Sequence, residues 1–311
     1  MNVFVAGATG AIGRRLLPLL LQGGHEVTGM TRSPERARTI EEAGARAVVC
    51  DALDAQGVKA AVAAATPDAV IHQLTSIPPA LDPRRYDQQM ATNDFLRTEG
   101  TRNLVEAAKA VGVRRVVAQS IAFAYAPIGP GPKREEDPLF LDAPHPFRRS
   151  VLAIRDLEDA VTHTDGIDGV VLRYGFFYGP GTAFARDGSM AETVRRRRLP
   201  IVGGGRGVYS FVELGDAASA TVAALTSPPG TYNVVDDDPA PVREWIPYYA
   251  RVLGVKPPLR VPAFVGRIAG GPLAAYYMTM VQGASNERAR RELGWTPGYP
   301  SWRQGFRESL G

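Results

Sequence analysis

Three glycines near the start of the chain lie between an apolar run and a helical segment. The run "NVFVAG" (2–7) leads into "GATGAIG", where Gly7, Gly10 and Gly13 have the spacing GxxGxxG, and "IGRRLLPLLLQGG" (12–24) follows. Glycine permits a tight strand-to-helix turn, close approach of the backbone to a ligand, and close packing of helix on sheet. The free N–H groups at the helix start can then bind phosphate. This stretch predicts the dinucleotide-binding turn of an α/β protein.

Strand-like and helical segments alternate after this turn. Short apolar runs are separated by helical segments such as "QGVKAAVAAA" (56–65) and "TNDFLRTEGTRNLVEAAKAVG" (92–112). Apolar strands that alternate with helices predict a parallel sheet covered by helices on both faces. We therefore expect an α/β fold of the Rossmann type, with a doubly wound parallel sheet. The further strands are expected over 25–32, 45–51, 68–74, 114–120 and 168–174.

The composition of the sequence changes after about Tyr174. Glycine and proline become dense, as in "GFFYGPG" and "LPIVGGGRG", and the helical segments become shorter. We expect residues 1–174 to form the NAD(P)-binding Rossmann domain and residues 175–311 to form mostly a smaller substrate-binding lobe. Within that lobe, about 205–237 are expected to return to the Rossmann sheet.

The end of the second expected strand indicates which dinucleotide is bound. An NAD site commonly places an acidic residue there to bind the ribose 2′-hydroxyl. This chain has Thr31 and Arg32 at that point, with Arg36 a turn later and Arg14 just after the glycines. Guanidinium groups suit a 2′-phosphate through bidentate hydrogen bonds, so NADP(H) is favoured over NAD(H). The alternative is that these are surface residues of an arginine-rich chain.

Composition excludes several classes of protein. The net charge is +4, but lysine stands only at positions 59, 109, 133 and 256, and the one basic run (195–198) is short, so we expect no nucleic-acid partner. A single cysteine, Cys50, and histidines without metal-ligand spacing predict no metal site. With no apolar run of membrane-spanning length and no signal-peptide pattern, we expect a cytoplasmic protein without a membrane partner.

Several motifs together resemble one family, the extended short-chain dehydrogenase/reductase or NAD-dependent epimerase/dehydratase superfamily. The turn "FVAGATGAIGRRLL", the segments "VVCDALD" (48–54) and "AVIHQLT" (69–75), and the helix and strand "EGTRNLVEAAKAVGVRRVVAQS" (99–120) carry the resemblance in the first part of the chain. In the second part "LRYGFFYGPG" (172–181), "YNVVDDDPAPVREW" (232–245) and "ASNERARRELGWTP" (284–297) continue it. The resemblance covers nearly the whole chain.

The resemblance implies a set of residues that line the cofactor. The glycine turn would hold the pyrophosphate, the acidic residue after the third strand would reach the adenine, and the end of the fourth strand would line the rest of the cleft. The cofactor-binding residues implied in this way, apart from the arginines already named, are Gly7, Thr9, Gly10, Ile12, Gly13, Thr31, Asp51, Ala52, Gln73, Leu74, Thr75 and Tyr174.

The family's catalytic pair is absent from this chain. The pair is a YxxxK motif on the helix after the fifth strand, where the tyrosine transfers a proton and the lysine lowers its pKa. Here the segment reads "PFRRSV", with Phe147 at the tyrosine position, Val151 at the lysine position and Ser150 keeping the register. No tyrosine in the chain has a lysine four residues after it. We therefore expect an atypical member of the family.

Two hydroxyl groups near the end of the fifth strand are candidates to replace the missing acid. Tyr125 is expected to face the nicotinamide, with the lining of the cleft as its alternative role. Ser120 matches one serine of the family's strand-end motif, while Ile121 stands where the catalytic hydroxyl often lies. A hydroxyl satisfied by the backbone is the alternative for Ser120.

The substrate side of the cleft is expected to be aromatic. Phe176 and Tyr209 stand where nucleotide-sugar members have an asparagine and an arginine, and Tyr178 is close by. This predicts a smaller apolar or aromatic substrate, with packing between the lobes as the alternative role of these rings. Arg155, a turn beyond Val151, is a candidate contact for an anionic group, or else a surface ion pair.

These observations lead to three hypotheses. The first is an NADP(H)-dependent oxidoreductase that reduces a carbonyl or activated double bond of a hydrophobic small molecule, such as a secondary metabolite. The second is an isomerase, epimerase or lyase that retains its cofactor, and the third is a non-catalytic NADP(H) sensor like the NmrA-like regulators. The resemblance also implies a homodimer through the helices expected over 92–112 and 146–161.

Overall fold

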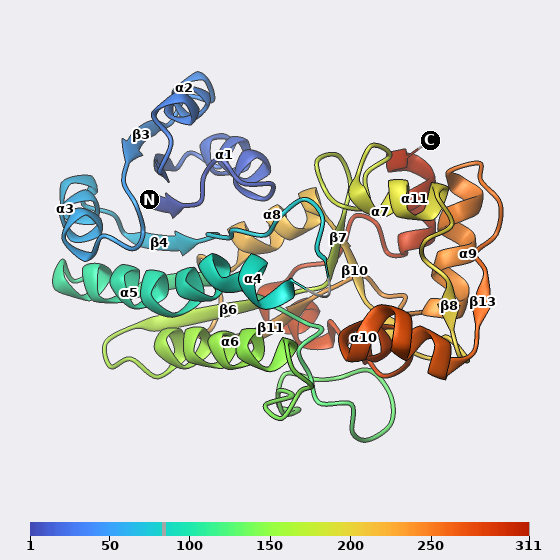
Figure 1. Ribbon diagram of the computed structural model, residues 1–311. Coiled ribbons are helices and arrows are strands. Elements are labelled where there is room, and N and C mark those ends of the chain that lie inside the picture. The colour runs from blue at the N-terminus through green and yellow to red at the C-terminus, as the bar shows by residue number, and fades with distance from the viewer. Residues whose placement is uncertain (83–84, 311) are drawn as a thin grey trace.

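Seven parallel strands form the central sheet of the computed structural model, which describes residues 1–82 and 85–310 (Figure 1). The strand order is β11-β6-β5-β4-β1-β2-β3, and every pairing in it is parallel. The expected Rossmann-type doubly wound sheet is confirmed. The strands are β1 (Asn2–Ala6), β2 (Glu26–Thr31), β3 (Arg46–Val49), β4 (Ala69–His72), β5 (Arg115–Ile121), β6 (Asp168–Tyr174) and β11 (Gly230–Val234).

Helices cover both faces of this sheet. Alternate strand residues point to opposite faces, so Val5 and Val117 pack in one apolar cluster with the helices α1 and α8, while Phe4 and Val116 pack in another with α3, α5 and α6. The helix α2 contributes Ile40 to the first cluster. The bounds are α1 (Gly13–Gln22), α2 (Pro34–Glu42), α3 (Ala55–Ala65), α5 (Thr101–Ala110), α6 (Phe147–Thr162) and α8 (Leu214–Ala223).

The sheet has a switch point beside β1. From β1 the chain proceeds outward through β2 and β3, and then returns to the other side of β1 to form β4, β5 and β6. Ligands of such sheets bind in the crevice at the carboxyl ends of the strands beside this point. The glycine turn follows β1 at that edge. After the start of the second lobe, the chain returns to the central sheet as α8 and β11. The strand β11 pairs with β6.

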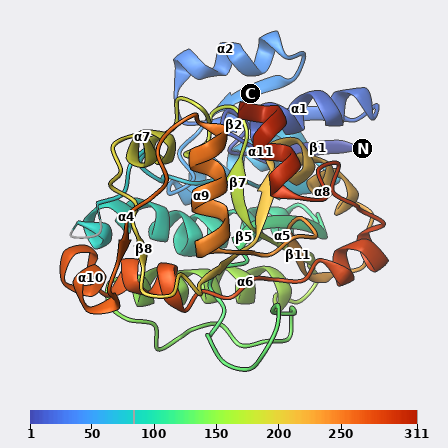
Figure 2. The same cartoon turned by 90° about the vertical axis from the view of Figure 1, so that its right-hand side faces the viewer.

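The second lobe is built from short strands and helices around an aromatic core (Figure 2). Three two-stranded sheets join β7 to β10, β9 to β12 and β8 to β13. Trp245, Phe211 and Phe306 are at most 1% exposed and pack together. The elements are β7 (Phe176–Tyr178), α7 (Ser189–Arg195), β8 (Ile201–Val202), β9 (Val208–Tyr209), β10 (Phe211–Glu213), β12 (Ala240–Pro241), α9 (Val242–Val252), β13 (Arg260–Val261), α10 (Ala263–Thr279), η2 (Ala289–Leu293) and α11 (Trp302–Leu310).

Two helices that face the cleft between the lobes are irregular. The helix expected over 92–112 is divided into α4 (Tyr86–Phe95), the π-helical turn η1 (Leu96–Gly100) and α5. The helix α10 changes direction at Gly271, which precedes Pro272. Gly271 has a φ of 74°, a conformation that favours glycine. π-Helical turns inside helices are frequent at functional sites. None of the described helices is long and apolar enough to cross a membrane.

Candidate active site

The glycine turn has the geometry of a dinucleotide cradle. Gly7 has a φ of 90°, and a Cβ there would lie 2.5 Å from the carbonyl oxygen of Gln73. A Cβ at Gly13 would lie 2.4 Å from the carbonyl oxygens of Gly7 and Ala8. Both positions therefore require glycine, and they leave the turn between β1 and α1 open to a pyrophosphate. The residues present fit the cofactor that the family uses.

The remaining residues of the turn support the backbone or border the next strand. Ile12 is 4% exposed and packs in the apolar cluster beneath α1. The Thr9 hydroxyl lies 3.5 Å from that of Thr31, at the end of β2. Gly10 donates its backbone N–H to the carbonyl oxygen of Gly7 at 3.0 Å. These contacts join the turn to β2, and Arg32 directly follows that strand.

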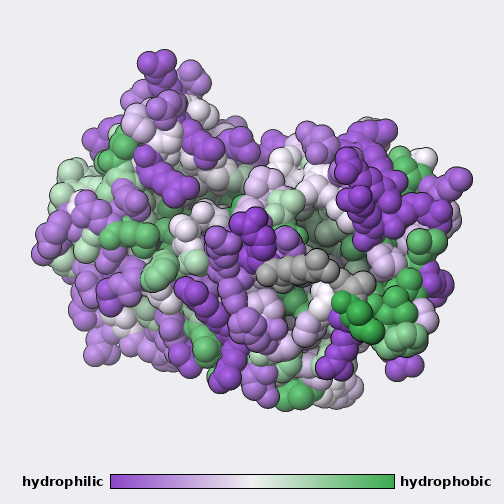
Figure 3. Space-filling view, in the orientation of Figure 1, coloured by the Kyte–Doolittle hydropathy of each residue, from purple (hydrophilic) through white to green (hydrophobic). Residues whose placement is uncertain are grey.

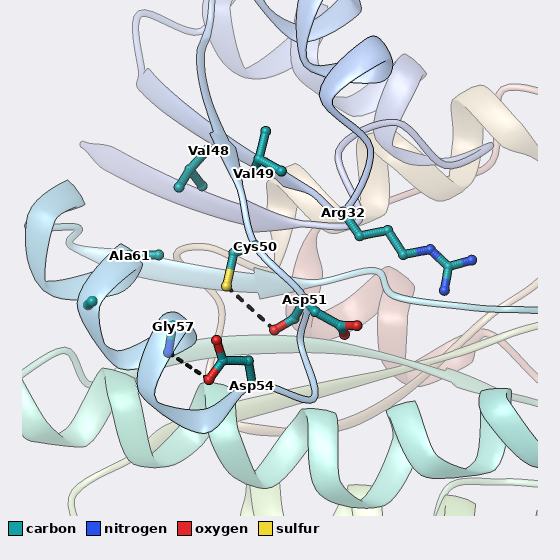
Figure 4. Close-up of a pocket in the computed structure, with 9 residues that line it drawn as sticks. Arg32, Val48, Val49, Cys50, Asp51, Asp54, Gly57 and Ala61 are labelled. Atoms are coloured by element: carbon teal, nitrogen blue, oxygen red, sulfur yellow. Dashed lines mark hydrogen bonds between the residues drawn. The ribbon is translucent and has the colours of Figure 1, made fainter.

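A groove of about 590 Å³, the adenosine groove, lies between Arg32, the end of β3 and the start of α3 (Figure 4). Arg32 and Asp51 both line it, and in Figure 4 their side chains point to the same side, away from Cys50. A carboxylate and a guanidinium side by side could bind the adenine amino group and a ribose phosphate. Ala52 is 3% exposed, and its carbonyl oxygen accepts a hydrogen bond from the Asn103 side chain at 2.9 Å.

The two other arginines of the cofactor prediction lie outside this groove. Arg36 is exposed on α2, where its backbone N–H is capped by the Ser33 hydroxyl at 3.2 Å. A guanidinium nitrogen of Arg14 lies 3.5 Å from where a Cβ of Gly181 would be, in the loop after β7. The expectation that Arg14 joins Arg32 in one pocket is therefore not met, because α1 directs its side chain toward the second lobe.

The end of β4 lies against the glycine turn. Gln73 meets Gly7 with its backbone, and its side chain donates to the Tyr174 hydroxyl at 3.2 Å. Leu74 is half-buried and Thr75 is exposed. Tyr174 was expected to contact the cofactor, but it is 0% exposed and bonded to Thr221 on α8 at 2.6 Å. Burial raises the pKa of Tyr174 to about 12, and its ring belongs to the core beneath the sheet.

An apolar cluster occupies the position of the family's catalytic residues. Ile121, Phe147 and Val151 stand where the resemblance places the serine, the tyrosine and the lysine. Their exposed fractions are 6%, 1% and 0%, and all three belong to one hydrophobic cluster. No acid, base or hydroxyl remains at these positions.

Tyr125 and Ser120 lie in a buried network rather than in the cleft. Tyr125 is 1% exposed; its hydroxyl donates to Asn233 at 2.7 Å and accepts from Arg173 at 2.7 Å. Ser120 donates to Glu158 at 2.6 Å, and Glu158 also accepts two hydrogen bonds from Arg173. Burial raises the pKa of Tyr125 far above its usual range. This geometry does not fit the expected proton donation to a substrate, because partners inside the protein occupy both hydroxyls.

Stacked rings line the substrate side of the cleft. Phe176 lies between Phe123 and Tyr209, with ring centroids 4.2 and 4.1 Å apart and interplanar angles of 14° and 20°. Tyr277 of α10 meets Phe176 edge-on at 6.2 Å. The surface is hollowed between the two lobes (Figure 3). Phe176 and Tyr209 are thus brought together, but Phe123 and Tyr209 cover the two faces of the Phe176 ring and Tyr209 is 6% exposed, which fits the alternative role of packing between the lobes.

Two of the predicted substrate residues lie elsewhere. Tyr178 is 0% exposed and meets Phe306 at 5.2 Å in the core of the second lobe. Arg155 points outward from α6 and pairs with its neighbour Asp156 at 2.6 Å, where both side chains are well exposed. Neither reaches the cleft. Sequence spacing places Arg155 on the helix face of Val151, but the next residue supplies its ion pair.

Sequence reasoning missed a polar cluster above Phe147. Arg97 of η1 and Asp94 of α4 are buried, and Tyr86 donates from α4 to the Ser150 hydroxyl at 3.3 Å. Tyr277 approaches from α10, with its ring centroid 5.7 Å from that of Phe147. The available signal was the pair of charged residues Asp94 and Arg97, spaced three apart and so on one face of a helical segment that also carries Leu96 and Leu104. Among the described residues, no group of acidic, histidine or cysteine side chains could hold a metal ion.

Sequence comparison identifies the family. The sequence model of the NAD dependent epimerase/dehydratase family matches residues 3–234. The chain belongs to this family. One relative, named "3-diazoavenalumate denitrifying reductase", from a Streptomyces species, is 48% identical over 310 residues, which cover 98% of this chain and 99% of the relative. A ketoreductase of Stigmatella aurantiaca that acts on a farnesylated quinoline oxide is 26% identical, with 95% and 92% covered.

Solved structures of this epimerase/dehydratase family share the fold. The UDP-glucose 4-epimerase of Thermotoga maritima, solved with UDP-glucose, has a TM-score of 0.77 at 20% identity and covers 99% of this chain and 97% of its own. The Thermus thermophilus UDP-glucose 4-epimerase, solved with NAD, has a TM-score of 0.76 at 24% identity, with the same coverage. With relatives named as reductases, the expectation of an NAD(P)-dependent oxidoreductase is confirmed.

Proposed function

We propose that this family member is an NADPH-dependent reductase that removes a diazo group, as N2, from a conjugated aromatic acid. The observation that carries the proposal is the apolar cluster of Ile121, Phe147 and Val151 at the catalytic positions. The relative at 48% identity supports it, because its name gives a diazo compound as the substrate and denitrification as the reaction. The proposal narrows the expected reduction of a carbonyl or activated double bond.

The chemistry explains why the proton-transfer pair can be absent. Reduction of a carbonyl leaves an oxyanion that an acid must protonate, which is the task of the family's tyrosine. When a hydride replaces a diazonium group, bound NADPH supplies both electrons of the new C–H bond, and N2 leaves with the electron pair of the broken C–N bond. The products are the arene, N2 and NADP⁺, and no proton is taken up or released. A site for this reaction needs no acid.

The residues of this chain then have binding and shielding roles. The half-buried ring of Phe123, at one end of the stack with Phe176 and Tyr209, would contact a planar substrate. Phe147 and Val151 are 1% and 0% exposed, and their apolar side chains fill the place where the family has a hydroxyl and an ammonium group, so they leave no room for water there. This matters because water is the competing nucleophile for a diazonium ion.

We also propose that the protein prefers NADP(H). Arg32 beside Asp51 in the adenosine groove supports NADP(H) over NAD(H), since no carboxylate follows β2 directly. The homodimer through the helices expected over 92–112 and 146–161, and the cytoplasmic location, stay predictions.

Isotope transfer tests the proposal directly. The protein is mixed with NADPH and a ring-diazotised 4-hydroxycinnamate, and NADPH absorbance, N2 release and the arene product are followed. We expect equal amounts of NADPH consumed, N2 released and arene formed. NADPH carrying deuterium at the transferred position should place one deuterium on the ring carbon that lost nitrogen. Cofactor oxidation only with ketones or enones, in a parallel panel, would overturn the diazo proposal and restore the broader expectation.

A further inference from the structure

A buried guanidinium group, that of Arg97, has no hydrogen-bond acceptor among the described residues. Arg97 is 6% exposed, and no described residue accepts a hydrogen bond from its side chain. Its nearest acidic group is Asp94, at 3.9 Å, which is beyond hydrogen-bond distance. Buried charges are normally both paired and hydrogen-bonded, because an unpaired one is costly to desolvate. Arg97 therefore has donors available for a ligand.

The carboxylates around Arg97 each have another cationic partner. Asp94 is also approached by Arg149, at 3.7 Å. Glu158 is bonded to Arg173 and Ser120, and Asp87, which acts on Asp94, pairs with His145 at 2.8 Å. An anionic ligand would give Arg97 an oxygen acceptor of its own.

Arg97 lies beside the place where the family's reaction occurs. It belongs to the π-helical turn η1, which packs against α6, the helix of Phe147 and Val151. Tyr277 interacts with Arg97 from α10, and its ring contacts both Phe147 and Phe176. The Tyr277 hydroxyl likewise has no hydrogen-bond partner among the described residues. Arg97 and the Tyr277 hydroxyl, which have no hydrogen-bond acceptor among the described residues, thus lie on elements that pack around Phe147.

We propose that Arg97, with the Tyr277 hydroxyl as second donor, binds the anionic oxygen group of an acidic aromatic substrate and so determines which substrates are accepted. The inference deepens the proposed function and takes from it only the substrate class. The anion is a carboxylate or a phenolate. A guanidinium recognises either oxygen by charge-assisted hydrogen bonds. Anchored there, the aromatic ring of the substrate would lie beside the ring stack of Phe123, Phe176 and Tyr209.

Binding of unreactive acids tests the inference without any reduction step. The full chain, saturated with NADP⁺, is titrated calorimetrically with 4-hydroxycinnamate, with cinnamate, and with the methyl esters of both. We expect at least one anionic probe to bind about 10- to 100-fold more tightly than methyl cinnamate, which has neither anion. Tight binding of cinnamate identifies the carboxylate. Tight binding of methyl 4-hydroxycinnamate, with the red-shifted absorbance of a phenolate, identifies the phenolate.

Variants assign the effect to Arg97. Arg97→Met should remove the preference for the anionic probe and leave the affinity for methyl cinnamate within about twofold. Asp94→Asn combined with Arg97→Met removes both buried charges and should give the same result if the single variant folds poorly. Tyr277→Phe should reduce the preference by a smaller factor. Arg102→Met, which removes an exposed ion pair with Glu99 on the same helical segment, is the matched control.

Two results would overturn the inference. One is wild-type protein that binds methyl cinnamate as tightly as the acids. The other is a preference for acids that survives in both Arg97 variants. Neither result bears on the diazo chemistry, because N2 release is measured separately. Loss of N2 release with acid binding intact would instead contradict the proposed function.

Discussion

The ring of Tyr277 lies 5.7 Å, centroid to centroid, from the ring of Phe147. A phenol from α10 therefore approaches the position where the family places its tyrosine, whereas Val151 stands at the position of the family's lysine. Burial raises the pKa of Tyr277 well above its usual value of 10, and the neighbouring phenols add to this effect. The hydroxyl stays protonated and can donate a hydrogen bond, so it is suited to binding an oxygen rather than to acting as a base.

Restoring the family's hydroxyl should not accelerate the reaction. We expect Phe147→Tyr to change kcat for N2 release by less than about threefold, because no step of the proposed chemistry uses an acid, whereas an acid in use contributes about 100-fold or more. Stopped-flow absorbance of NADPH measures this. Phe177→Tyr, which adds the same hydroxyl to a half-buried ring packed on Tyr174, is the control for the added polar group. A gain approaching 100-fold would show that proton transfer limits the wild-type rate.

Tyr125 should contribute to stability rather than to turnover. Tyr125→Phe removes the hydrogen bond that the hydroxyl donates to the Asn233 side-chain oxygen and the one that it accepts from Arg173, and we expect the free energy of unfolding to fall by about 1–3 kcal/mol. The kcat should stay within about twofold of wild type. Urea denaturation and steady-state kinetics measure the two quantities. Tyr248→Phe, which removes a hydrogen bond to the Arg303 carbonyl at the partly buried edge of the second lobe, should cost less. A large loss of kcat at unchanged stability would restore Tyr125 as the acid.

The features that could be predicted from the sequence are those fixed by local spacing. Gly7 and Gly13 are required by contacts within the turn and with the adjacent strand, so the triplet and the strand before it identify the fold. The loss of the catalytic pair is also local, because Phe147 and Val151 are one helical turn apart. The register of α6 is fixed by its own sequence.

Side-chain direction at strand ends could not be predicted in the same way. Tyr125 comes after β5, and Tyr178 is the last residue of β7. The guanidinium group of Arg173 lies over the ring of Tyr125, and the aromatic core of the second lobe surrounds the ring of Tyr178. Arg97 and Tyr277 are far apart in sequence. They come near each other only because η1 and α10 both pack around Phe147. Such contacts depend on how the two lobes pack.

A buried histidine should make stability depend on pH. His72 is 1% exposed; its Nδ1 accepts from the backbone N–H of Leu74 at 3.1 Å, so its Nε2 donates to Thr101 at 2.9 Å. Burial lowers the pKa of His72 from 6.5 to about 4. The unfolded chain therefore takes up the proton first as pH falls, and stability present above pH 6.5 is lost between about 6.5 and 4.

The expected size of this effect is about 2 to 3 kcal/mol between pH 7 and pH 4.5. Denaturant unfolding at both pH values measures it. His72→Gln should be less stable than wild type at pH 7 but should lose less stability on acidification, by that amount. His163→Gln, at an exposed position on the outer end of α6, should lose as much as wild type. Equal pH dependence in wild type and His72→Gln would contradict the assignment.

Arg32 should determine the preference between the two dinucleotides. It lines the adenosine groove beside Asp51, whereas Arg36 is exposed on α2 outside it. We expect Arg32→Ala to weaken NADPH binding about 10- to 100-fold, through loss of charge-assisted hydrogen bonds to the 2′-phosphate, and to leave NADH binding within about twofold. Quenching of tryptophan fluorescence by each dinucleotide gives the two affinities. Arg36→Ala should have a smaller effect, and Arg38→Ala, further along the exposed face of α2, is the matched control. Equal weakening of NADPH and NADH binding in Arg32→Ala would show that this side chain maintains the shape of the groove but does not bind the 2′-phosphate.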